Sequence, residues 1–182
     1  MHSIPQNPNN FAPAHINERQ QILTVQHLGF DDEMHEGVII MHEEVAEDVL
    51  AFFELALDLR FPIEKIVLIS DERYQWNDEL SMADNNTSGF NYRTIMDTDR
   101  LSNHATGRAF DVNPKQNIYL KRAESGEILF SYPEGAVYNL GAKGTLTKEH
   151  PLVIFMKERG WEWGGDWQRG DGVVDYQHFE KP

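Results

Sequence analysis

The chain of 182 residues contains no cysteine, and this absence constrains its fold more than any other single feature. No disulfide can brace the chain, and neither a thiolate zinc site nor a cysteine nucleophile is available. The fold must therefore rest on a hydrophobic core, and any metal ion must be held by histidine and carboxylate side chains. A hydrophobic content of 40% is sufficient for such a core. We expect a single domain over residues 21–182, preceded by an irregular segment over residues 1–20.

The chain is strongly acidic. Sixteen Lys and Arg against thirty Asp and Glu give a formal net charge of -14 at pH 7. This charge argues against a nucleic-acid partner bound through a basic face. The longest apolar runs, such as residues 38–41, are far shorter than the roughly 20 residues that a membrane-spanning helix needs. The first residues lack a basic segment followed by an apolar one, so we expect no secretory signal in this sequence.

Hydrophobic periodicity predicts two helices among several short strands. The helices are expected over residues 45–59 and 149–159, the second ended by Gly160. The strands are expected over residues 63–69, 90–95, 108–112 and 173–179. Residues 115–147 read as a long excursion with one hairpin, and loops of this length are usually functional. Because helices and strands are mixed and do not alternate regularly, the pattern favours the α+β class.

Residues 102–111 carry the strongest functional signal and read S-x-H-x-x-G-x-A-x-D. In a fully extended chain, His104 and Asp111 would lie about 23 Å apart, whereas the ligands of one zinc ion lie about 2 Å from it. The chain must therefore bend back if both residues bind one ion. Gly107 is the natural place for the bend, because glycine accepts backbone angles that other residues avoid. Asp111 would then project from the strand that begins near Arg108.

The last predicted strand offers a third ligand and a base. A catalytic zinc site usually has three protein ligands and keeps a fourth position for water, so we predict one Zn²⁺ held by His104, Asp111 and His178. A nearby carboxylate is needed to take the proton of that water, and Asp175 is our candidate. Residues three apart point to opposite faces of a regular strand, so this prediction demands an irregularity between Asp175 and His178. The alternative is an edge strand with an incidental acid and histidine.

Together these residues resemble the zinc D-alanyl-D-alanine carboxypeptidases and L-alanyl-D-glutamate endopeptidases, the VanY-like enzymes that cut peptidoglycan stem peptides. The motif over residues 102–111 matches at every fixed position. A W-G-G-x-W turn over residues 163–167 and an acid-x-x-His over residues 175–178 match later elements in order and spacing. The resemblance extends from about Gly37 to Glu180. It implies a small antiparallel sheet flanked by helices, as in the Hedgehog and DD-peptidase fold, with the zinc ligands and the base named above.

The resemblance also suggests further site residues. The family places an arginine upstream of the first ligand, facing the scissile carbonyl, and Arg93 lies in the corresponding segment. A guanidinium aimed at the developing oxyanion would stabilise the tetrahedral intermediate, although a routine ion pair is the alternative. Ser102 either binds substrate or shapes the turn. Trp161, Trp163 and Trp167 are expected in the core or in the pocket wall.

The substrate implied by the resemblance is a peptidoglycan stem peptide, cleaved at D-Ala-D-Ala or at L-Ala-D-Glu. An aspartate at the position of Asp175 is frequent in the endopeptidase branch, so the bond that is cut stays open. The resemblance implies an extracytoplasmic location, in the periplasm or cell envelope, and we expect a monomer.

Two alternatives to a zinc peptidase remain. A zinc-containing module that binds without cutting, like the Hedgehog signalling domain, shares the fold, but the presence of Asp175 and Arg93 favours an enzyme. Two histidines and one carboxylate also form the metal site of non-haem iron oxygenases. Those sites usually space the first pair as H-x-D, and an oxygenase would have no use for Asp175.

Overall fold

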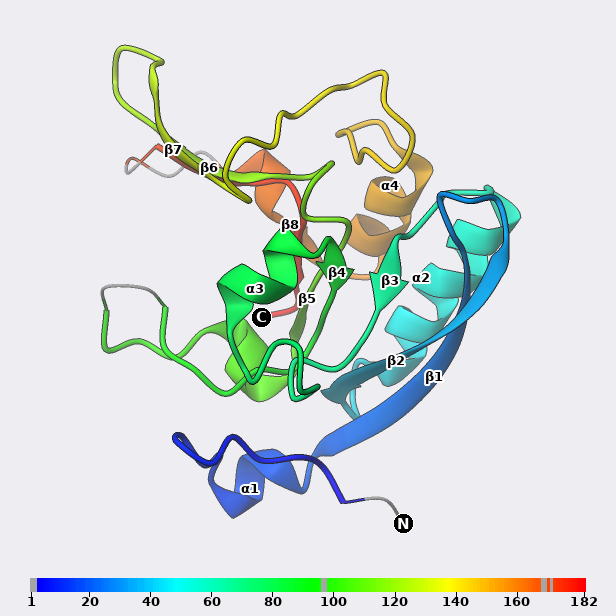
Figure 1. Cartoon of the computed structure of the whole chain (residues 1–182), viewed down its shortest axis with the longest axis vertical. Coiled ribbons are helices and arrows are strands. Elements are labelled where there is room, and N and C mark those ends of the chain that lie inside the picture. Colours follow the sequence, from blue (N-terminus) through cyan, green and yellow to red (C-terminus); the bar gives the residue numbers. More distant parts are fainter. Residues whose placement is uncertain (1–2, 96–97, 168–169, 171) are drawn as a thin grey trace.

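The computed structural model describes residues 3–95, 98–167, 170 and 172–182, and its fold is α+β as the sequence predicts (Figure 1). The helices are α1 (Ala14–Asn17), α2 (Ala46–Asp58), α3 (Asp78–Ala83) and α4 (Pro151–Glu158), with the 3-10 helices η1 (Asn103–Thr106) and η2 (Gly164–Asp166). The strands are β1 (Gln20–Leu28), β2 (Met34–His42), β3 (Lys65–Ile66), β4 (Asn86–Thr87), β5 (Ala109–Asp111), β6 (Tyr119–Arg122), β7 (Ile128–Tyr132), β8 (Glu162–Trp163), β9 (Val173–Asp175) and β10 (His178–Glu180).

The strands of the described residues form four small sheets, which is compatible with the predicted small antiparallel sheet but divides it into several. β1 and β2 form a long antiparallel hairpin, and two three-stranded antiparallel sheets have the strand orders β5-β10-β8 and β7-β6-β9. β3 and β4 pair in parallel. The segment predicted as one strand over residues 173–179 breaks after Asp175, so that β9 joins one sheet and β10 joins another.

Two other predicted strands differ from the structure. Only β3 remains of the strand expected over residues 63–69. Residues 90–95 form no regular strand, because their backbone bonds to the segment that carries His104: Asn91 donates to the His104 carbonyl, and Ser102 donates to the Arg93 carbonyl. The predicted helices correspond to α2 and α4, and the hairpin within residues 115–147 is β6–β7. Within residues 1–20, α1 and the first residue of β1 are regular.

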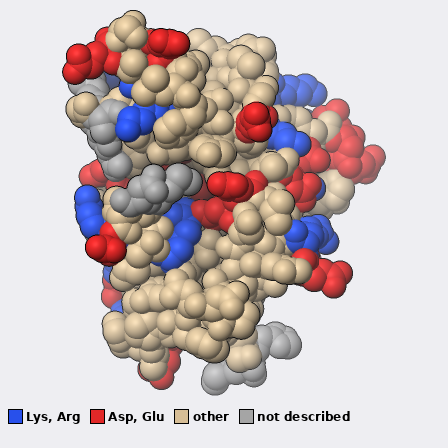
Figure 2. Space-filling view, turned by 60° about the vertical axis from the view of Figure 1, so that its left-hand side comes forward, with Lys and Arg blue, Asp and Glu red and all other residues tan. Residues whose placement is uncertain are grey.

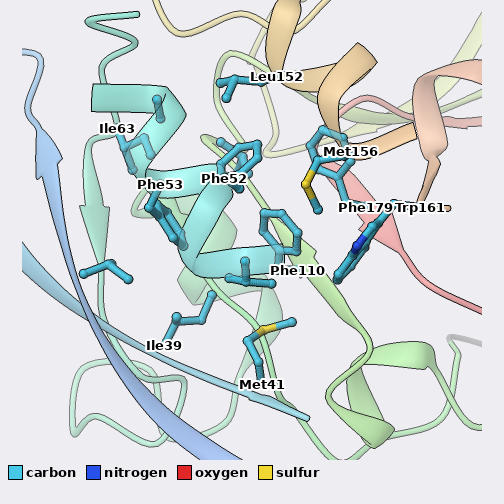
Figure 3. Close-up of a cluster of buried hydrophobic side chains, with 14 of the residues drawn as sticks. Ile39, Met41, Phe52, Phe53, Ile63, Phe110, Leu152, Met156, Trp161 and Phe179 are labelled. Carbon is cyan, nitrogen blue, oxygen red and sulfur yellow. The ribbon is translucent and has the colours of Figure 1, made fainter. Parts of the chain in front are cut away.

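The main core lies between α2, α4, the β1–β2 hairpin and the sheet β5-β10-β8 (Figure 3). Phe52 of α2 contacts Phe110 of β5 and Phe179 of β10, with ring centroids 5.1 Å and 5.7 Å apart. Phe110 and Phe179 stack on each other and are fully buried. Successive side chains of a strand point to opposite faces, so burying these two rings directs the adjacent Asp111 and His178 away from the core.

The charged side chains of the face shown in Figure 2 lie among one another, with no continuous basic patch. This arrangement agrees with the acidic composition of the chain. In the described ranges, no helix has the length and apolar character that crossing a bilayer requires.

Candidate metal centre

His104 and Asp111 are brought together by a tight turn at the predicted bend. The side chain of Ser102 caps η1 by accepting a hydrogen bond from the backbone of His104, and Gly107 ends η1 in the left-handed conformation, with a φ of 71°. A Cβ on Gly107 would lie 2.7 Å from the backbone nitrogen of His42, so the close packing also requires glycine. The next strand, β5, then carries Asp111 back beside His104.

His178 joins them because β10 pairs directly with β5, with His178 opposite Asp111. The Nδ1 atom of His178 lies 2.9 Å from Asp111 Oδ1 and 3.2 Å from His104 Nε2. The distance from His104 Nε2 to Asp111 Oδ2 is 3.3 Å. In the described part of the chain, these are the three residues whose donor atoms lie close enough to hold a metal ion, all within 4.8 Å of one another.

The outer nitrogens of both histidines are already engaged. Nδ1 of His104 lies 2.8 Å from the Gly89 carbonyl, and Nε2 of His178 lies 3.0 Å from a carboxylate oxygen of Glu180. A neutral imidazole has one N–H, and both outer partners are acceptors, so each ring in its neutral form, the form that binds a metal ion, would donate outward and turn its lone pair inward. Two nitrogen lone pairs and a carboxylate therefore face one point. This donor set suits Zn²⁺ and is stabilised by a cation at that point.

The electrostatics of the centre favour positive charge. Burial would raise the pKa of Asp111, but the charges and hydrogen bonds of His104 and His178 outweigh it and hold this pKa far below its usual range. Burial opposes a charge on His178 as well, yet its hydrogen bonds to Asp111 and Glu180 raise its pKa to about 10.

Asp175 lies beside this centre on the end of β9, before the turn that separates β9 from β10. The break in the strand is the irregularity that the sequence prediction demands. Asp175 is 9% exposed, and its Oδ1 atom is buried without a hydrogen-bond partner among the described residues. Burial, reinforced by the negative charge of Asp111, raises the pKa of Asp175 to about 7. A buried carboxylate with a free oxygen and a raised pKa is suited to accept a proton at neutral pH.

Comparison with protein families gives one match. The model of a family described as D-alanyl-D-alanine carboxypeptidase matches residues 96–181, which include the three clustered ligands and Asp175. Residues 96–181 are thus similar to this family. The resemblance found in the motif is thereby confirmed, and the family description supports a peptidase. Comparison with curated proteins and with solved structures gives no match.

The W-G-G-x-W turn packs directly against Asp175. A Cβ on Gly164 would lie 2.3 Å from the backbone oxygen of Asp175 and 2.9 Å from its Cβ. Trp163 donates its indole N–H to the carbonyl of Tyr176, which fixes the turn after Asp175. The first glycine of the turn therefore lets η2 approach β9 closely enough to hold Asp175 in place.

We expect Gly164→Ala to lower turnover because the added methyl group must push the backbone of Asp175 out of position. A displacement of about 1 Å at a reacting group can cost about 100-fold in rate. Zinc affinity should stay within the range of the wild type, since no zinc ligand contacts Gly164. The measurement is kcat alongside zinc affinity, with Gly170→Ala as control because a Cβ there meets no atom within 4 Å. Equal losses of turnover in both variants would contradict this role for Gly164.

Arg93 lies outside the residues that match the carboxypeptidase family, but its backbone lies next to the centre. Its carbonyl accepts from Ser102, and its guanidinium forms an ion pair with Asp78, the first residue of α3. The same carboxyl group accepts a hydrogen bond from Asn91, which bonds in turn to the backbone of His104. The Nε atom of Arg93 is buried and has no hydrogen-bond partner among the described residues. Arg93 thus forms the ion pair, while its Nε–H group has no acceptor among the described residues.

The structure also defines the positions of the other residues that the sequence suggested for the site. Ser102 is 6% exposed and caps η1, so the structure gives it the turn-shaping contact. Trp161 and Trp163 are buried in the core cluster. Trp167 lies at the centre itself, with its ring 5.3 Å from that of His178. These positions agree with the expectation of core and pocket wall.

Sequence reasoning missed the groups that hold the two histidine rings, namely Gly89, Glu180 and Asn103. Glu180 accepts from Nε2 of His178 and from the side-chain amide of Asn103, which belongs to the η1 turn that carries His104. Glu180 therefore links both histidine-bearing segments. Its spacing of two residues from His178 on a strand could have revealed it, because such residues share a face. The Gly89 carbonyl has no side-chain signature and could not have been found this way.

We expect Glu180→Gln to weaken zinc binding about 10- to 100-fold, the usual cost of losing an outer carboxylate partner of a metal-binding histidine. A glutamine keeps the size of the side chain but removes the negative charge that orients the His178 ring. Competition with a chromophoric chelator measures the affinity. Glu162→Gln on the neighbouring strand β8 is the control, and it should bind zinc like the wild type. Unchanged affinity in Glu180→Gln would contradict the role of this carboxylate.

Proposed function

We propose that the protein is a zinc-dependent metallopeptidase that hydrolyses a peptide bond next to a D-amino acid in peptidoglycan stem peptides. One observation carries this proposal: three inward-facing donor atoms, from His104, Asp111 and His178, converge next to a buried carboxylate with a free oxygen. A binding module needs the three donors but has no use for that fourth group. The family match supports a peptidase, and the chemistry of its substrate supports an extracytoplasmic location.

The residues of the site have separate roles in hydrolysis. Zn²⁺ held by His104, Asp111 and His178 would polarise the scissile carbonyl and lower the pKa of a water molecule. Asp175 takes the proton of the attacking water and delivers it to the leaving amine nitrogen. A pKa raised by burial makes Asp175 a strong enough base for the first transfer and a strong enough acid for the second.

Arg93 supplies the remaining positive charge. Its guanidinium would stabilise the oxyanion that develops on the scissile carbonyl, while the ion pair with Asp78 holds the side chain in place. Ser102 acts through the turn, because its hydroxyl group is engaged with the backbone of His104. We therefore favour the turn-shaping role of Ser102 over substrate binding.

The D-Ala-D-Ala bond is our first choice of substrate bond, and its support is the description of the matching family. The second candidate is the L-Ala-D-Glu bond, and the specific observation that favours it is an aspartate, not a glutamate, at position 175. Both bonds occur in one stem peptide, so a single digestion distinguishes them.

The test is digestion of purified muropeptides, followed by mass spectrometry of the products. We expect cleavage that stops when zinc is removed with a chelator and returns when zinc is added. Loss of a single alanine identifies the carboxypeptidase, and release of the peptide after its first residue identifies the endopeptidase. Zinc and muropeptide binding without chelator-sensitive cleavage would refute the proposal and indicate the non-catalytic module.

A further inference from the structure

The sheet β7-β6-β9 carries a row of aromatic side chains on the face from which Asp175 projects. In the register of this sheet, Tyr119 lies opposite Tyr132 on one side and opposite Asp175 on the other. Residues opposite one another in neighbouring antiparallel strands project from the same face. Phe130, two residues before Tyr132, shares that face as well. The row therefore begins at the proposed base and runs across β6 to β7.

The two faces of this sheet have different surroundings. Leu120, which projects from the other face, is 1% exposed and belongs to the interior. On the face of Asp175, the side chain of Phe130 is 37% exposed, and Tyr119 and Tyr132 are half-buried. The three rings contact one another, with centroids 5.7 Å, 5.8 Å and 6.4 Å apart. A cluster of aromatic rings outside the core is typical of a ligand-binding surface.

The length of the row matches a short piece of peptide. Neighbouring strands lie about 4.8 Å apart, so the strand of Tyr132 lies about 10 Å from that of Asp175. An extended peptide advances about 3.3 Å per residue, so about three residues span this distance. A substrate whose reacting bond lies at Asp175 thus has its next residues within reach of the rings.

The charge on this face also suits a stem peptide. Lys121 lies opposite Phe130 and projects from the same face, in a chain whose net charge is -14. Stem peptides carry carboxylates together with small aliphatic side chains. The rings can cover the aliphatic groups, and the ammonium group of Lys121 can pair with a carboxylate.

We propose that the aromatic face, defined as Tyr119, Phe130 and Tyr132 with Lys121, binds the residues of the stem peptide that lie within about three positions of the cleaved bond. The inference rests on the proposed function, because it requires the reacting bond to lie at Asp175. It also gives a structural role to the β6–β7 hairpin, which projects from the body of the molecule (Figure 1). The sugar of the glycan strand is the competing occupant, and the experiment below separates the two.

The test compares Phe130→Ala with Ile128→Ala. Ile128 lies on the same strand and is 48% exposed, but a register shift between Lys121 and Arg122 places Ile128 opposite Arg122 and so on the other face. The substrates are a sugar-free stem pentapeptide and a minimal substrate with only the residues on either side of the cleaved bond. Phe130→Ala should lower kcat/KM for the pentapeptide about 3- to 10-fold, mainly through KM, and leave the minimal substrate unchanged. Ile128→Ala should change neither.

Three results would overturn the inference: an equal loss on both substrates, an equal loss in Ile128→Ala, or a loss that appears only when the disaccharide is attached. The last result would assign the face to the sugar. Calorimetry of the pentapeptide with the Asp175→Asn variant measures binding without cleavage, and adding Phe130→Ala should weaken it by the same factor. Peptide binding that depends on Phe130 in a protein without peptidase activity would refute the proposed function alone.

Discussion

The Asp175→Asn variant is expected to lose about 10²- to 10⁴-fold in kcat while it still binds one zinc ion. Asparagine keeps the shape of the side chain but cannot take the proton of the attacking water. The three proposed zinc ligands are untouched, so the metal content should match that of the wild type. Steady-state kinetics and metal analysis of the same preparation measure both quantities. Turnover within a few-fold of the wild type would show that Asp175 is not the base.

The same variant is expected to raise the stability of the metal-free protein at high pH. The pKa of Asp175 is about 7 in the fold, above its ordinary value of 3.8, so folding disfavours its ionised form. Its ionisation therefore destabilises the folded protein. This loss of stability begins as the pH rises above about 4 and is complete above about 7. The difference between the two pKa values corresponds to a loss of at most about 4 kcal/mol in the free energy of unfolding.

Chemical denaturation at pH 4 and at pH 8 checks this sign. Asp175→Asn should be more stable than the wild type at pH 8, and the advantage should shrink toward pH 4. Bound zinc favours the ionised carboxylate, so the advantage at pH 8 should also shrink in the metal-loaded protein. A variant that is less stable at pH 8 in the absence of metal would indicate that Asp175 is held by contacts beyond those described.

The metal centre was predictable because its residues lie in a dense sequence pattern. The S-x-H-x-x-G-x-A-x-D segment sets the bend at Gly107 and the strand that carries Asp111, and both are local consequences of chain geometry. The helices α2 and α4 were predictable for a similar reason, since their apolar stripes repeat within a few residues. The break after Asp175 followed from requiring both Asp175 and His178 at one centre.

The arrangement of sheets was not predictable from local pattern. β9 and β10 lie only two residues apart, yet they pair with different partners, and such pairing depends on contacts distant in sequence. The long-range partner of Glu180 illustrates the same point, because Asn103 lies 77 residues away. Short strands of two to five residues also carry too few side chains for a clear period. The candidate metal-binding and catalytic residues could thus be identified from the sequence. The residues that hold them in place could be identified only from the fold.

The Asp111→Asn variant should lose zinc affinity by more than the roughly 100-fold that removal of an outer partner costs. It removes the one anionic ligand and keeps the size of the side chain, so two inward-facing histidine nitrogens remain with a neutral amide. Addition of zinc should raise the Tm of the wild type by mass action and leave that of Asp111→Asn nearly unchanged. Peptidase activity should fall to background at the same time, because every proposed catalytic step depends on the metal centre.

A matched control comes from His35 and His42, two histidines with the same seven-residue spacing as His104 and Asp111. His35 is exposed, and its partner in the structure is Asp31, not a second metal-binding histidine. His35→Ala should therefore retain the zinc-dependent rise in Tm. A loss of that rise in His35→Ala, or its persistence in Asp111→Asn, would show that zinc binds elsewhere. The spacing of two histidines or of a histidine and an acid is then insufficient to define a site, and convergence of the donor atoms on one point is the property that matters.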